Sequence, residues 1–130
     1  MTGNYAFGKT VKSSYDETIR KATEALASEG FGVLTTIDVA ATLKKKLGKD
    51  TKPYVILGAC NPSFAHRALE AEPEIGTLLP CNVVVREQAD GATRVDIMDP
   101  LAVLKLTERA DIAPIANEVR QKLERVLAAI

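Results

Sequence analysis

The spacing of apolar residues in the first part of the chain predicts a strand followed by a helix. Residues 5–12 alternate between apolar and polar positions, which is typical of a strand. Ser14 and Glu17 form a capping box, so we expect a helix to begin there, and Gly30 to end it. The apolar face of this helix repeats at helical spacing through Tyr15, Ile19, Ala22 and Leu26.

The middle of the chain predicts two more strands and two helices. Residues 31–37 form an apolar strand, and Asp38 is placed to cap a short helix over residues 39–48. Residues 52–60 are apolar on both faces, so we expect this third strand to be central and covered on both sides, or covered by a dimer partner. Asn61 as N-cap and Pro62 at the first helical position begin the next helix, which ends at Pro73.

The last part of the chain predicts a hairpin and a long helix. Residues 81–88 and 92–99 form two strands joined at Asp90-Gly91, a dipeptide typical of hairpin turns. Pro100 ends the second of these strands, and the short, mostly apolar segment 101–106 indicates a helical turn. Asp111 is expected to cap the last helix. The apolar stripe of that helix comprises Ile112, Ile115, Val119, Leu123, Val126 and Ile130.

These elements follow the order β-α-β-(short α)-β-α-β-β-α. The order and the hairpin favour an α+β fold, with a mostly antiparallel sheet and helices packed on one face. The 130 residues fit a single domain over residues 1–130. A domain of this size buries about two thirds of its unfolded surface, so we expect it to fold without a disulfide or a structural metal.

Composition narrows the classes of function. Seventeen basic residues balance 17 acidic residues, and this zero net charge argues against nucleic-acid binding, which requires a basic face. The one basic cluster, Lys44 to Lys46, is explained by the favourable dipole at a helix C-terminus, with a partner-binding patch as the alternative. No segment approaches the roughly 20 apolar residues of a membrane span. Two cysteines are too few for a disulfide scaffold, so we expect a cytoplasmic protein with reduced thiols.

The two cysteines mark the segment with the most candidate chemistry. Cys60 ends the third predicted strand and Cys81 begins the fourth. Antiparallel pairing of these strands would bring the thiols together, whereas parallel pairing would separate them by about 20 Å, and the later hairpin favours the antiparallel arrangement. His66, the only histidine, follows on the adjoining helix. These three side chains would form an open site for zinc or copper, although their spacing is not a recognised zinc pattern and no fourth ligand is evident.

Simpler interpretations compete with a metal site. In the simplest interpretation, both cysteines are small buried hydrophobic residues and His66 is a surface residue of a helix. A redox role would require exposure and a low thiol pKa, which the helix start after Cys60 favours, but no C-x-x-C motif is present. Asn61 is explained as a helix cap, and the free amides of that helix start offer a place for a small anion. No P-loop, dinucleotide motif or Ser/His/Asp arrangement is found, so enzyme activity stays an open question.

The segment "YVILGACNPSFAHRALEAEPEIGTLLPCNVVVRE", followed by "DGATRVDIMDP", resembles the family known as domain of unknown function 302. The shared pattern is an apolar strand ending in Cys-Asn-Pro, then Leu-Pro-Cys before a strand of valines, then a glycine turn and a strand ending near Asp-Pro. The resemblance spans nearly the whole chain and implies a small α+β protein that forms a homodimer. It draws attention to Asn61, Pro62, Pro80 and Cys81, and it implies no catalytic roles.

The sequence therefore predicts a binding module for a small ligand or an anion at the helix start after the third strand. The predicted site comprises Cys60, Asn61, Pro62, Pro80 and Cys81. The alternative is a thiol-redox or metal-binding protein that uses Cys60, Cys81 and His66, with zinc or copper as the metal. We expect a homodimer that binds neither nucleic acid nor a membrane.

Overall fold

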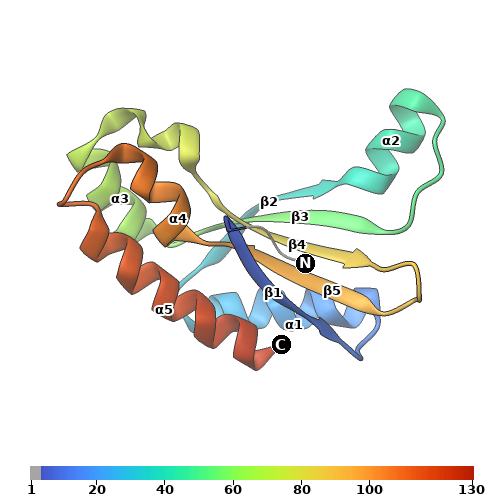
Figure 1. The fold of residues 1–130 in the computed structure, drawn as a ribbon. Helices are drawn as coiled ribbons and strands as arrows, with labels where there is room; N and C mark the ends of the chain where they lie inside the picture. The colour runs from blue at the N-terminus through green and yellow to red at the C-terminus, as the bar shows by residue number, and fades with distance from the viewer. Residues whose placement is uncertain (1–3) are drawn as a thin grey trace.

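The computed structural model describes residues 4–130 and places five strands of this range in one sheet (Figure 1). From one edge to the other, the sheet contains β1 (Ala6–Val11), β5 (Thr93–Met98), β4 (Cys81–Glu87), β3 (Tyr54–Cys60) and β2 (Gly32–Asp38). Every pair of neighbouring strands is antiparallel. The α+β fold with an antiparallel sheet is thus confirmed.

All of the helices but one lie on one face of the sheet or at one of its ends (Figure 1). The two long helices, α1 (Tyr15–Ser28) and α5 (Ala113–Ala129), contact each other beneath the sheet. A second group gathers at one end, formed by α3 (Pro62–Ala71), the 3₁₀ helix η1 (Pro73–Leu78), α4 (Pro100–Leu104) and the 3₁₀ turn η2 (Lys105–Thr107). The short helix α2 (Val39–Leu47) stands apart from these, at the far end of the arm that β2 and β3 form. The opposite face of the sheet carries no helix in the part of the chain that the structure describes.

The core lies between the sheet and the two long helices. Side chains alternate between the two faces of a strand, so every second residue of the inner strands points toward the helices and is buried. In β4 and β5 these positions are held by Val83, Val85, Val95 and Ile97, none of which is exposed. From the helices, fully buried Leu26 and Leu123 pack against them in the same cluster. The predicted apolar stripes of α1 and α5 therefore form the core side of each helix.

Local hydrogen bonds explain where the first helices begin. The Glu17 amide donates to Ser14 Oγ at 3.2 Å, as the capping box predicts, but the Glu17 carboxylate binds Arg20 instead of reaching back. The Ala41 amide donates to Asp38 Oδ1 at 2.8 Å, which confirms the predicted cap of α2. The predicted cap at Asp111 is wrong. Its carboxylate binds Arg109 at 2.8 Å, and α5 begins only at Ala113.

The environment of β3 matches the prediction only in part. This strand lies inside the sheet, between β2 and β4, but it is not the central strand and helices cover only one of its faces. Val55, Leu57 and Ala59 are buried on the covered side, whereas Tyr54 and Ile56 on the other side are half-buried. Helices therefore do not cover the second face of β3, and its cover by a dimer partner stays a prediction. Among residues 4–130, no helix is long and apolar enough to cross a membrane.

Candidate functional site: an apolar pocket beside the two cysteines

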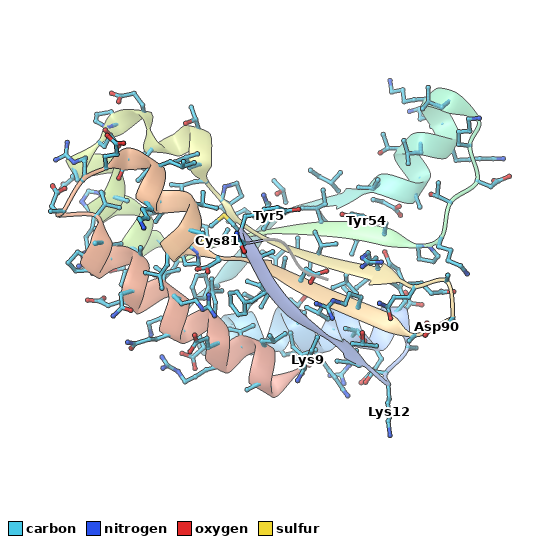
Figure 2. All side chains as sticks on the ribbon, viewed as in Figure 1. Tyr5, Lys9, Lys12, Tyr54, Cys81 and Asp90 are labelled. Atoms are coloured by element: carbon cyan, nitrogen blue, oxygen red, sulfur yellow. The ribbon has the colours of Figure 1, made fainter. Side chains whose placement is uncertain are left out.

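Strand pairing brings the two cysteines to the same end of the sheet. β3 and β4 are antiparallel, and their register places Ala59 opposite Cys81, with Cys60 one residue further along β3. The expected antiparallel arrangement is therefore present, and both thiols are free. Figure 2 shows Cys81 where the strands meet the group of helices at the end of the sheet. Both cysteines line one cavity of about 340 Å³.

Apolar side chains from separate parts of the chain form the walls of this cavity. One wall comes from α3, another from the strand ends and the segment before β4, and a third from α4 and α5. On α3 the lining residues are Phe64, Ala65, Ala68 and Leu69. Leu79 and Pro80 line it just before β4, and Leu104, Ile115 and Val119 close the side that faces the core. Of the 16 lining residues, none carries a carboxylate, ammonium, guanidinium or imidazole group.

Two local features of the strands shape the mouth of the cavity. The pairing of β2 with β3 shifts between Val33 and Thr35, and the residue between them, Leu34, is 68% exposed at the rim. Gly58 on β3 leaves room for its neighbours, because a Cβ there would lie 2.2 Å from Thr35 Oγ1 and 3.1 Å from Pro80 Cγ. The glycine therefore allows β2 and the segment before β4 to approach β3 closely.

The apolar surroundings change the chemistry of Cys81. Burial raises the pKa of this thiol to about 12, and the neighbouring Cys60 raises it by a smaller amount. Desolvation acts in this direction because it disfavours the charged thiolate. Cys81 is therefore a protonated thiol at neutral pH, with the properties of a small apolar side chain.

Asn61 and Pro62 differ in their relation to the cavity. Asn61 is the N-cap residue of α3 and lines the cavity, but its side chain caps no helix amide. Its Nδ2 instead donates to the Glu29 carbonyl at 3.4 Å, which ties the start of α3 to the end of α1. Pro62 occupies the first turn of α3, as predicted, but it is exposed and does not line the cavity. Of the five predicted ligand-binding residues, the structure thus brings four to one pocket.

His66 lies on the outer side of α3, so the structure does not bring it together with the two cysteines. Successive residues of a helix are rotated by about 100°, so His66 points away from the side of α3 on which Ala65 and Ala68 line the cavity. Its side chain is 71% exposed, and its Nε2 lies 2.9 Å from Glu70 Oε1. Within residues 4–130, no group of three His, Cys, Asp or Glu side chains is arranged to hold a metal ion.

The fold and the pocket define a small α+β protein with an apolar cavity at one end of its sheet. Residues 7–130 match the family described as domain of unknown function DUF302, and the chain belongs to this family. The crystal structure of an "uncharacterized conserved protein DUF302 from Bacillus stearothermophilus" is similar to this chain. The two share 31% sequence identity and a TM-score of 0.90, and the match covers 98% of each chain. No curated protein matches the chain.

Proposed function

We propose that this protein is a binding module for a small, uncharged, largely apolar molecule, which it holds in the pocket beside Cys60 and Cys81. The observation that carries the proposal is a cavity of about 340 Å³ whose walls are apolar and whose rim is exposed at Leu34 and Leu69. Ligand pockets in proteins are typically concave, mostly apolar and at least about 300 Å³ in volume. A few polar groups at such a site then orient the ligand.

The wall chemistry favours an apolar ligand over the anion that the helix start suggested. An anion in this pocket would lose its hydration and meet no cationic side chain from the lining residues. The Asn61 amide is the largest polar group in the wall, and it is already engaged with Glu29. An apolar molecule loses little on leaving water, and its transfer into the pocket is favourable by about 25 cal/mol for each Å² removed from water.

The thiol chemistry of the alternative function receives less support from the same geometry. A redox pair requires a reactive thiolate, but burial raises the pKa of Cys81 to about 12. A metal bound by Cys60 and Cys81 would need further ligands, and His66 does not supply one because it binds Glu70 on the outer side of α3. Cys60 and Cys81 are better explained as polarizable, weakly polar parts of a pocket wall.

A fluorescence titration with N-phenylnaphthylamine, a neutral apolar fluorophore, tests the proposal. We expect saturable enhancement with the native chain and binding about tenfold weaker or more in Ala65→Leu, which places a larger side chain in the cavity. His66→Leu is the matched control, because it adds a leucine on the exposed side of the same helix. A probe that saturates the site at 100 times its Kd should add about 2.7 kcal/mol of stability, or roughly 8–10 °C in Tm.

Two results would contradict the proposal. One is fluorescence that rises without saturation in the native chain, which indicates non-specific adsorption. The other is equal binding by native chain and Ala65→Leu, with His66→Leu alone affected, which places the probe on the outer surface of α3. Circular dichroism of each variant shows whether the fold is retained. Homodimer formation stays a prediction, and sedimentation equilibrium of the native chain is the measurement that tests it.

A further inference from the structure

The face of the sheet that no described helix covers, here called the open face, contains a second cavity of about 460 Å³. Polar and charged side chains line much of this cavity, whereas the first cavity is apolar. Its lining includes arginine, aspartate, asparagine, glutamine and tyrosine side chains, and it shares no residue with the apolar pocket. Tyr54 on β3 and Tyr5 just before β1 both belong to it, and both are labelled in Figure 2. The cavity is therefore a separate feature of the molecule.

Strand register places two arginines side by side in this cavity. Tyr54 of β3 is opposite Arg86 of β4, and Arg86 is opposite Arg94 of β5. Directly opposed residues of antiparallel strands have Cβ atoms about 4.5–5.5 Å apart, and two like charges in this relation repel each other. One row across the sheet thus presents a phenol and two guanidinium groups on the uncovered side.

Only one of the two arginines has its charge balanced within the described chain. Arg94 forms an ion pair with Asp96 at 3.0 Å, and both side chains are about four-fifths buried, with exposures of 20% and 21%. Gly8 on β1 makes room for that carboxylate, since a Cβ there would lie 2.4 Å from Asp96 Oδ1. Arg86 is half-buried as well, but no hydrogen bond or ion pair of its side chain is found within residues 4–130.

We propose that this row is a binding site for a small organic oxyanion, a carboxylate or a phosphate, held by Arg86 and supported by Arg94 and Tyr54. The two arginines and Asp96 together leave one net positive charge in the cavity. A partly buried guanidinium without a counter-charge is unfavourable, and an anion at this position offsets both its desolvation and its repulsion from Arg94. The planar guanidinium donates two parallel hydrogen bonds to one carboxylate or phosphate group.

The remaining lining residues indicate what the rest of the ligand contacts. Tyr54 brings a hydroxyl donor to the row, and Asn82 and Gln88 bring amides to neighbouring positions. Val84 and Met98 supply apolar surface beside them. This combination suits a molecule with one charged end and a small apolar or aromatic body. Asp96 repels anions, and its ion pair with Arg94 confines the favourable position to Arg86.

Isothermal titration calorimetry with the full chain tests this site, with benzoate and inorganic phosphate as separate probes and ionic strength held constant with chloride. We expect saturable binding of at least one probe, and the probe that binds identifies the class of oxyanion. Arg86→Gln should weaken this binding about tenfold or more, because a charge-assisted, bidentate contact is lost. Arg20→Gln is the control, since it removes the same charge from exposed α1, where Arg20 binds Glu17 and Glu24.

A second variant keeps the test informative if Arg86→Gln does not fold. Arg86→Lys retains the positive charge but loses the planar guanidinium that donates two parallel hydrogen bonds. Binding of the probe should therefore weaken by a smaller factor than in Arg86→Gln. The proposal is overturned if neither probe binds saturably, or if Arg20→Gln weakens binding as much as Arg86→Gln does. It is also overturned if the native chain is a dimer that binds no probe and Arg86→Gln makes it monomeric. That result would assign this face to a second copy of the chain.

Discussion

The buried Cys81 thiol should react much more slowly than a free cysteine. Burial raises its pKa from 9.0 to about 12, so at pH 8 it has about 900 times less thiolate than an unperturbed thiol. A thiolate of higher pKa is a better nucleophile, with a Brønsted slope of about 0.4–0.5, which recovers a factor of about 15–30. Alkylation should therefore be roughly 30–60 times slower, before any steric protection by the pocket walls.

Iodoacetamide labelling of the folded Cys60→Ser variant at pH 8, followed by mass spectrometry, measures this rate for Cys81 alone. The reference is an unstructured peptide that contains one cysteine. The rate should continue to rise with pH beyond pH 9, since the thiol ionises only near pH 12. Labelling of Cys81 at the rate of the peptide would refute the reasoning, because it would mean that water reaches the thiol and that the pocket wall is not apolar.

The same pKa shift makes stability depend on alkaline pH. The pKa of Cys81 is higher in the folded chain than in the unfolded chain, so its contribution is fully present below pH 9 and is lost as the pH rises toward 12. The loss is at most about 1.4 kcal/mol per pH unit. The difference in urea midpoint between the native chain and Cys81→Ala isolates this effect from other groups. A difference that does not change between pH 8 and pH 11 would contradict it.

Three further substitutions test the packing of the fold. Gly58→Ala should destabilise the chain by about 1–3 kcal/mol in urea unfolding, since the new Cβ would lie 2.2 Å from Thr35 Oγ1. In a Thr35→Ala background the same substitution should destabilise the chain less, because that hydroxyl is absent. Leu26→Ala should cost about 2–5 kcal/mol, because Leu26 is fully buried between α1 and the sheet, and a loss under 1 kcal/mol would contradict the assigned core. Arg120→Gln should destabilise the chain by about 1–3 kcal/mol in the same assay, because Arg120 binds Asp99 at 2.6 Å and stacks on the Phe7 ring at 3.9 Å. The control is Arg20→Gln on exposed α1, which should destabilise the chain by under about 1 kcal/mol.

The sequence predicted the features that short-range rules determine. The caps at Ser14 and Asp38 form as expected, because each depends on one side chain and an amide three residues away. The antiparallel pairing that brings Cys60 close to Cys81 was favoured by the Asp90-Gly91 hairpin, and the register of β3 and β4 agrees with it. The resemblance to the DUF302 family is confirmed by the match over residues 7–130.

Features that depend on competing contacts or on distant parts of the chain were missed. The cap at Asp111 failed because Arg109 competes for its carboxylate, a choice that sequence spacing alone does not decide. The position of His66 was missed as well: Ala65 and Ala68 face the cavity, so His66 lies on the outer side of α3, away from the cysteines. The apolar positions of α3 did carry a signal for the pocket. No sequence signal indicated that α4 and α5 close the pocket, since those helices lie far from α3 in the sequence.

The most direct test of the apolar pocket is a methyl NMR titration of the native chain with N-phenylnaphthylamine. If the ligand enters the cavity, the methyl signals of Ala65, Ala68 and Val119 should shift and saturate together. The methyl signals of Val84 and Met98, on the open face of the sheet, should stay in place. Saturable shifts confined to Val84 and Met98, or shifts spread over the whole surface, would show that the pocket beside Cys60 and Cys81 is not the binding site.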